Sequence, residues 1–205
     1  MKNSIKIFDI GSDSTTLRRL TKFSSLFSYE LFIVEPQKKF ELSTKRLFQE
    51  KSKIKQTYLN CAISSSRTKK IFYETADPSA SSFYEPNIKL INTYRIDNFF
   101  KIVGKKKISC ITLKQSFSDA KIKNIDLLNI SAQGSELDCL KVDNKTLKKV
   151  TLVRCYVDFV EKYKNQPLAD EIISHLKKRG FTLISETEPI YIKDKKISSA
   201  LIFIN

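Results

Sequence analysis

The sequence predicts an α/β domain built on a mostly parallel sheet with helices on both faces. Three observations lead to this fold class. Short apolar, β-branched runs alternate with helical patterns, which is typical of parallel strands joined by crossover helices. Glycine or proline stands at the end of several of these runs. The 205 residues, 41% of them hydrophobic and 29% charged, suit one domain over residues 1–205 with a sizeable core.

The first strand and helix are indicated by a change of period in the sequence. Residues 5–10 are apolar and β-branched and predict a buried strand, which Gly11 ends. A helix is expected next, because three residues that can cap one follow the glycine: Ser12, Asp13 and Ser14. Apolar residues then recur at helical spacing, namely Leu17, Leu20, Phe23 and Phe27.

The following elements repeat this alternation. Residues 29–36 predict a second buried strand, which ends at Pro36 because proline cannot donate to a ladder. Residues 38–51 predict a second helix and residues 56–64 a third strand. Residues 69–75 are expected to form an additional strand that pairs antiparallel.

The second half of the chain contains further strand and helix patterns. A stretch rich in proline and serine, 76–87, predicts a surface loop. More strands are expected at 108–113, 125–132 and 150–160, and helices at 135–141 and 167–180. The last two strands, 181–185 and 199–204, are expected to pair antiparallel.

The net charge of +15 favours acidic partners such as nucleic acid, phosphorylated sugars or anionic lipid. The lysines are spread from end to end and RNA-binding aromatic motifs are absent, so nucleic-acid binding is not the favoured function. No apolar run approaches the ~20 residues of a membrane span, and the N-terminal apolar stretch is too short for a signal peptide. We therefore expect a cytoplasmic protein.

The cysteines and the single histidine do not have the spacing of a metal site. No C-x-x-C pair occurs, so the four cysteines are expected to be buried free thiols: Cys61, Cys110, Cys139 and Cys155. The histidine, His175, lies within the helix predicted at 167–180, away from the strand ends. A structural or solvated role is expected for it, and no metal is predicted.

Candidate ligand-binding residues follow the first strands. In an open α/β sheet, ligands bind at the carboxyl ends of the strands, where the strand order reverses. Gly11 lets the backbone approach a ligand there, although only one of the three glycines of the dinucleotide fingerprint is present. Glu35 ends the second strand, where an acid can accept both ribose hydroxyls of an adenosine. Ala62 and Ile63 are placed to flank an adenine, with Ser64 as a polar contact.

Six segments resemble, in order and spacing, blocks of the FkbM family of S-adenosylmethionine-dependent methyltransferases. Residues 125–140, IDLLNISAQGSELDCL, resemble the family's block IDLLKIDVEGAELEVL. The other segments are IFDIGSDSTT, ELFIVEP, AISSSRTKKIFYET with SASSF, CITLKQSF, and YKNQPLADEIISHLKKRGF. The resemblance runs from about Lys6 to Ile204, nearly the whole chain.

This resemblance implies a class I methyltransferase (Rossmann-like) fold, with a mostly parallel seven-stranded sheet and an antiparallel last strand. It implies S-adenosylmethionine as cofactor and a hydroxyl on a small or carbohydrate-linked molecule as methyl acceptor. The cofactor-binding residues it implies are Asp9, Ile10, Gly11, Ser12, Asp13, Glu35, Pro36, Ile63 and Ser64. The residues it places toward the acceptor, as catalytic candidates, are Ser131, Gln133 and Glu136.

Several polar positions depart from the family pattern. Ser131, Lys114 and Ala200 stand where the family usually has aspartate, and Asn129 stands where it has lysine. Thr15 replaces the last glycine of the first motif, and the other departures are at Asp13 and Gln133. A general base adds ~10²–10⁴-fold for a hydroxyl acceptor, and serine cannot replace a carboxylate in that role near neutral pH.

These departures leave alternatives to the leading hypothesis of methyl transfer. One is a methyltransferase-like fold that no longer catalyses and acts as a binding or scaffold subunit. Another is a basic nucleic-acid-binding protein, whose affinity would fall steeply with salt. The family often has an additional N-terminal segment over the site, whereas this sequence begins almost at the first strand. A more open cleft, or one covered by a protein partner, is therefore expected.

Overall fold

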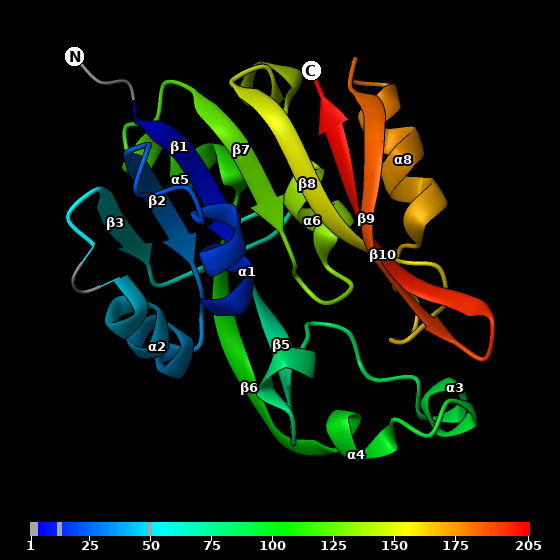
Figure 1. Ribbon diagram of the computed structural model, residues 1–205. Helices are drawn as coiled ribbons and strands as arrows, with labels where there is room; N and C mark the ends of the chain where they lie inside the picture. The colour runs from blue at the N-terminus through cyan, green and yellow to red at the C-terminus, as the bar shows by residue number, and fades with distance from the viewer. Residues whose placement is uncertain (1–3, 12–13, 49–50) are drawn as a thin grey trace.

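The computed structural model describes residues 4–11, 14–48 and 51–205, and it has the class I methyltransferase fold (Figure 1). Its main sheet has seven strands in the order β3-β2-β1-β7-β8-β10-β9. The strands are β1 (Ile5–Ile10), β2 (Tyr29–Val34), β3 (Ile54–Leu59), β7 (Ile125–Ile130), β8 (Val150–Asp158), β9 (Thr182–Ile192) and β10 (Lys195–Ile204). Within the seven strands of this sheet, β10 alone is reversed and pairs antiparallel with both β8 and β9, which confirms the predicted antiparallel last strand.

Helices cover both faces of the main sheet because the strands present apolar side chains on both sides. On one face, α1 (Ser14–Leu20) and α2 (Lys38–Phe48) pack through Leu17 and Phe48. On the other, the helices are α5 (Leu113–Asp119), α6 (Glu136–Leu140), α7 (Asn144–Leu147) and α8 (Ala169–Lys177). Phe117 and Leu176 are among the residues that bring α5 and α8 into the larger core. None of the described helices is long and apolar enough to cross a membrane.

A second, smaller sheet lies beyond the carboxyl ends of the main strands (Figure 1). It contains β4 (Ala62–Ile63), β5 (Thr68–Thr75) and β6 (Ile102–Ile111) in the order β4-β6-β5. The segment between β5 and β6 holds a 3₁₀ turn, η1 (Pro78–Ala80), and two short helices, α3 (Ile88–Thr93) and α4 (Asp97–Phe100). This segment and the small sheet therefore stand where ligands bind in open α/β folds.

The structure corrects three sequence predictions. The first helix ends at Leu20, and Phe23 and Phe27 are half exposed in the turns that follow, so the apolar stripe does not continue. The strand predicted at 56–64 is broken at residues 60–61, and its second part joins the smaller sheet as β4. The strand predicted at 108–113 likewise belongs to that sheet, and it begins earlier, at Ile102.

The loop predicted at 76–87 is only partly on the surface. Ala80, Ser81 and Ser82 are buried, and the Ala80 carbonyl accepts a hydrogen bond from the Tyr163 hydroxyl at 2.8 Å. Asp77 caps this turn by accepting a hydrogen bond from the Ser79 N–H at 2.9 Å. The loop therefore contributes to the cavity described next.

Candidate functional site

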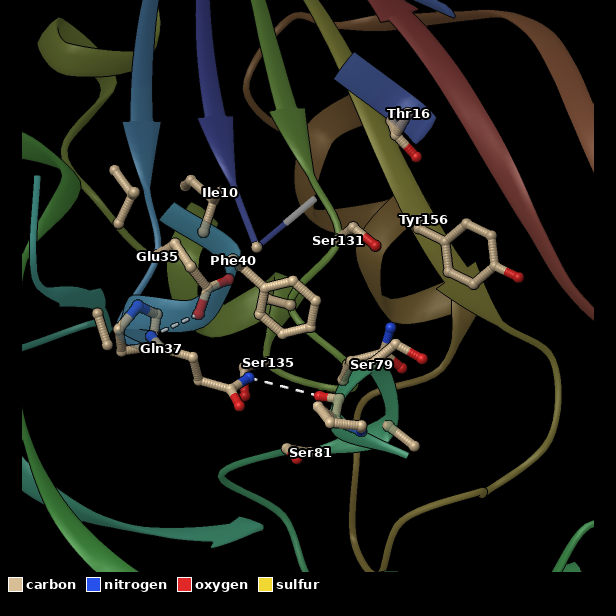
Figure 2. Close-up of a pocket in the computed structure, with 18 of the residues that line it drawn as sticks. Ile10, Thr16, Glu35, Gln37, Phe40, Ser79, Ser81, Ser131, Ser135 and Tyr156 are labelled. Atoms are coloured by element: carbon tan, nitrogen blue, oxygen red, sulfur yellow. Dashed lines mark hydrogen bonds between the residues drawn. The ribbon is translucent and has the colours of Figure 1, made fainter. Parts of the chain in front are cut away.

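A cavity of about 460 Å³ opens at the carboxyl ends of β1, β2, β7 and β8. Figure 2 shows Glu35 and Phe40 toward one side of it, Ser131 and Tyr156 toward the other, and Ser79 and Ser81 from the η1 loop below them. The cavity thus lies between the main sheet and the segment that connects β5 to β6. We call the side of Glu35 the β2 half and the side of Tyr156 the β8 half.

Five residues predicted to bind the cofactor line this cavity: Ile10, Gly11, Glu35, Pro36 and Ile63. Glu35 is 8% exposed, and its Oε1 accepts a hydrogen bond from the Gln37 N–H at 2.7 Å. Gln37 in turn donates from Nε2 to the Pro78 carbonyl at 3.4 Å, which ties this turn to the η1 loop. The carboxylate of Glu35 is therefore fixed at the end of β2.

Gly11 is required by the close approach of two strand ends. Its φ is +72°, and a Cβ there would lie 2.6 Å from the carbonyl oxygen of Ser131. The Ser131 N–H donates to the Ile10 carbonyl at 2.9 Å, which holds the two turns together. A side chain at position 11 would separate these turns and alter the cavity floor.

Three predicted site residues lie behind the cavity wall. Asp9 is fully buried and accepts a hydrogen bond from Asn129 Nδ2 at 2.6 Å. The backbone N–H of Ser64, itself buried, donates to the Ile111 carbonyl, and Glu136 accepts from the Ala132 N–H at 2.8 Å. Their roles toward a ligand stay predictions, and any such role would be indirect. Ser12 and Asp13 lie outside the described residues.

Asn129 belongs to a polar row that crosses the sheet. Arg154 donates from Nη1 to Asn129 Oδ1 at 2.8 Å and from Nη2 to Glu188 Oε2 at 2.9 Å. Glu188 also lies 3.4 Å from Arg19 Nη1 of α1. The row therefore runs from the buried Asp9 on β1 to the cavity, which Arg19, Arg154 and Glu188 line. The family's lysine at position 129 is thus replaced by an amide that receives a hydrogen bond from the next strand.

The β8 half of the cavity contains the predicted Ser131 and Gln133 together with Tyr156 and Lys162. Gln133 Oε1 accepts a hydrogen bond from the Tyr163 hydroxyl at 3.2 Å, and that hydroxyl also donates to the Ala80 carbonyl at 2.8 Å. Burial raises the pKa of Tyr156 above its ordinary value, so its hydroxyl stays protonated near neutral pH. This half presents hydroxyl, amide and ammonium groups.

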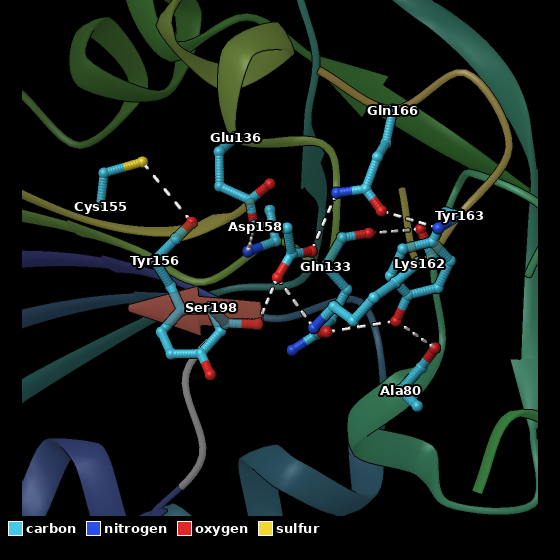
Figure 3. A network of polar contacts seen from close by, with 12 residues as sticks. Ala80, Gln133, Glu136, Cys155, Tyr156, Asp158, Lys162, Tyr163, Gln166 and Ser198 are labelled. Carbon is cyan, nitrogen blue, oxygen red and sulfur yellow. Dashed lines mark hydrogen bonds and ion pairs between the residues drawn. The ribbon is translucent and has the colours of Figure 1, made fainter. Parts of the chain in front are cut away.

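Lys162 is held by a buried cluster centred on Asp158 (Figure 3). Asp158 Oδ1 lies 2.9 Å from Lys162 Nζ and accepts from the Ser198 hydroxyl at 2.6 Å, and Oδ2 accepts from Gln166 Nε2 at 2.8 Å. Burial lowers the pKa of Lys162, but attraction to Asp158 outweighs this effect, so the pKa lies above its ordinary value. The cavity wall therefore carries a cation fixed in place by its partner.

Glu136 has the opposite electrostatic environment. Burial, followed by repulsion from Asp158, raises its pKa to about 8. Its carboxyl group is therefore largely protonated at neutral pH. Glu136 is not part of the cavity lining, and its predicted catalytic role stays a prediction.

Among the described positions that depart from the family pattern, Ser131 and Gln133 line the cavity, whereas Asn129, Lys114 and Ala200 do not. Lys114 is exposed in α5, 3.4 Å from Asp143, and Ala200 is fully buried in β10. Thr15 does line the cavity. His175 contacts the Leu140 carbonyl through Nε2 at 3.1 Å, and burial lowers its pKa.

The cysteines are all free thiols. Cys61 is half-buried rather than buried, whereas the other three are buried. Among the described residues there is no cluster of three or more histidine, cysteine, aspartate or glutamate side chains that could hold a metal ion.

Sequence reasoning missed the β8 residues, although a signal for them exists. Arg154, Tyr156 and Asp158 alternate with apolar residues along β8, so they share one face of the sheet. Polar side chains at every second position of a predicted core strand indicate a face that turns toward a cavity. Lys162 has no comparable signal, because it lies in a loop after the strand.

The comparisons with known proteins identify the family. The model of the methyltransferase FkbM domain matches residues 10–183. The chain belongs to the FkbM methyltransferase domain family. No curated protein sequence matches the chain.

Solved structures support the fold of this FkbM domain. The FkbM methyltransferase from Methylobacillus flagellatus KT is 14% identical with a TM-score of 0.56, and the match covers 98% of this chain and 43% of that one. The precorrin-6y C5,15-methyltransferase from Geobacter metallireducens GS-15 is 8% identical (TM-score 0.50), covering 100% and 83%. The magnesium protoporphyrin IX methyltransferase from Synechocystis PCC 6803, solved with bound S-adenosylmethionine, is 8% identical (0.51), covering 98% and 70%.

Proposed function

We propose that this FkbM domain transfers a methyl group from S-adenosylmethionine to a hydroxyl oxygen of a small or carbohydrate-linked acceptor in the cytoplasm. The observation that carries the proposal is the division of one cavity into two chemically different halves. The β2 half has a fixed carboxylate at the end of β2 and a glycine turn at the end of β1. The β8 half has hydroxyl groups and a buried ammonium.

The residues of the β2 half fit the nucleoside part of the cofactor. Glu35 stands where an acid can accept hydrogen bonds from both ribose hydroxyls, and such bonds to a charged group contribute ~1.5–3 kcal/mol each. Ile63 and Phe40, which also line the cavity, offer apolar surface for an adenine. When bound, S-adenosylmethionine supplies an electrophilic methyl group on a sulfonium.

The residues of the β8 half suit a hydroxylated acceptor. Ser131, Tyr156 and Gln133 can exchange hydrogen bonds with it and orient its oxygen, and proximity and alignment supply much of the catalysis. With the cofactor bound, methyl transfer to this oxygen would form a C–O bond as the donor's C–S bond breaks, and the acceptor would lose its proton. Lys162 stabilises the negative charge that develops on the oxygen as that proton leaves for solvent.

One observation favours a second function, that of a binding subunit without turnover. The acids that line the described cavity are Glu35, Asp77 and Glu188. Asp77 caps η1 and Glu188 is held by arginines, so neither is positioned as a general base. If this function holds, the cofactor binds and no methylated product forms.

Calorimetric titration with S-adenosylmethionine and S-adenosylhomocysteine tests the proposal. We expect micromolar affinity that falls at least tenfold, ~1.4 kcal/mol, in Glu35→Ala. The matched control is Glu30→Ala, because Glu30 is on the same strand but pairs with Lys55 at the surface. No binding of either compound at millimolar concentration would overturn the proposed cofactor site, and equal binding by Glu35→Ala would remove Glu35 from it.

A further inference from the structure

Glu188 stands between two arginines in the lining of the cavity. Its Oε2 lies 2.9 Å from Arg154 Nη2, and its Oε1 lies 3.4 Å from Arg19 Nη1. The two guanidinium groups come from β8 and α1, and all three residues line the cavity. One carboxylate is therefore shared by two cations at the place where α1, β8 and β9 meet.

An irregularity in β9 brings Glu188 to this position. Glu188 has a φ of +54°, in the left-handed region that a non-glycine residue seldom adopts. The register of β9 against β10 shifts here, between the pairs Ser198–Ile190 and Ala200–Thr187. A regular strand would continue past this point, whereas the observed bulge directs one acid toward the arginines.

Arg154 is held more firmly than Glu188, whereas the side chain of Arg19, 62% exposed, is not. The Arg154 side chain is 8% exposed and is fixed from behind by Asn129, which contacts the buried Asp9. The Glu188 side chain is 39% exposed, so water can replace its contacts at modest cost. The arginine is thus a permanent part of the wall, whereas the glutamate is exchangeable.

We propose that Arg19 and Arg154 form a subsite for a carboxylate group of a bound ligand, and that Glu188 takes the place of that group in this structure. A guanidinium matches a carboxylate with two parallel hydrogen bonds, so an entering carboxylate replaces Glu188 without loss of charge pairing. The inference deepens the proposed function and rests on it, since the ligand is either the cofactor or the acceptor. The carboxylate is that of the cofactor's amino acid or that of an acidic acceptor.

The binding of two adenosine thioethers tests whether the carboxylate is that of the cofactor's amino acid. S-adenosylhomocysteine has the amino-acid group with its carboxylate, and 5′-methylthioadenosine has the same nucleoside thioether without the amino-acid group. If the cofactor's carboxylate binds here, Glu188→Gln tightens S-adenosylhomocysteine binding about three- to tenfold and Arg19→Gln weakens it by a similar factor. Neither variant changes the affinity for 5′-methylthioadenosine more than about twofold. Calorimetry of the wild type and the two variants gives all six affinities without any need for turnover.

The binding of an acidic and a neutral sugar tests whether the carboxylate is that of an acidic acceptor. With S-adenosylhomocysteine saturating the protein, D-glucuronate and D-glucose are titrated against the wild type and Glu188→Gln. If the acceptor carries the carboxylate, Glu188→Gln tightens glucuronate binding at least threefold and leaves glucose unchanged, about the effect of one charged contact.

A matched control separates the subsite from general charge effects. Glu186→Gln removes the same charge two residues earlier on β9, where Glu186 pairs with Lys196 and does not line the cavity. It is expected to leave every affinity unchanged. If Glu188→Gln affects neither S-adenosylhomocysteine nor glucuronate, the subsite is wrong even though 5′-methylthioadenosine still binds. If neither nucleoside product binds the wild type, the proposed function itself fails.

Discussion

The two halves of the cavity are built in different ways. The β2 half is formed mainly by turns that directly follow β1 and β2, and its carboxylate, Glu35, is held by a neighbour in sequence, Gln37. The β8 half is formed by side chains from distant segments, as Ser198 to Asp158 and Tyr163 to Ala80 show. One half therefore depends on backbone turns, and the other on a network of buried charges.

This difference predicts how each half tolerates change. A turn fixed by backbone geometry responds mainly to residues that alter φ or add a Cβ. A buried network responds to the loss of any charged member, because the remaining partner is left uncompensated in a poorly solvated site. Substitutions can therefore show whether the two halves are independent.

The largest effect is expected for Asp158→Ala in the β8 half. The substitution leaves the ammonium of Lys162 buried without its nearest carboxylate and removes the acceptor for Ser198 and Gln166. The free energy of unfolding is expected to fall by about 3–5 kcal/mol, as measured by urea denaturation. Asp170→Ala, at an exposed position in the first turn of α8, should cost less than about 1 kcal/mol. Equal losses in the two variants would show that the Asp158 network is not a stabilising unit.

The pH dependence of the free energy of unfolding tests the buried charges near the β8 half, because Glu136 titrates there. Its pKa is raised from 4.5 to about 8, so between these values the folded protein holds a proton that the unfolded chain has released. Stability contributed by this group therefore falls as pH rises through this window, by up to about 1.4 kcal/mol per pH unit. Glu136→Gln keeps an acceptor for the Ala132 N–H and removes the titration.

The measurement is urea denaturation of the wild type and Glu136→Gln from pH 5 to pH 9. The variant should gain stability relative to the wild type as pH rises, and the difference should level off above pH 8. Parallel curves for the two proteins would contradict the raised pKa.

The sequence predicted the β2 half better than the β8 half, and the reason is physical. Gly11 and Glu35 follow apolar runs, so local pattern placed them at strand ends before any tertiary contact was known. The break of the third strand at residues 60–61 was not predictable from pattern alone, because β4 is extended but pairs with β6 rather than β3. Lys162 and Glu188 were missed because a loop and a strand bulge, rather than a periodic pattern, bring them to the cavity.

The smallest effect on stability is expected from two glycine substitutions. Comparing them separates the cost of a left-handed backbone conformation from the cost of a steric clash at the new Cβ. Gly11 and Gly180 have φ values of +72° and +92°, but a Cβ at position 180 meets nothing within 4 Å. Gly180→Ala should cost about 1–2 kcal/mol for the left-handed conformation alone. Gly11→Ala adds the collision with the Ser131 carbonyl, so it should cost more and also weaken S-adenosylhomocysteine binding in calorimetry. Ser131 lies in the β8 half, so its contact with position 11 joins the two halves of the cavity. If Gly11→Ala lowers stability but leaves the affinity for S-adenosylhomocysteine unchanged, the two halves are less coupled than this contact implies.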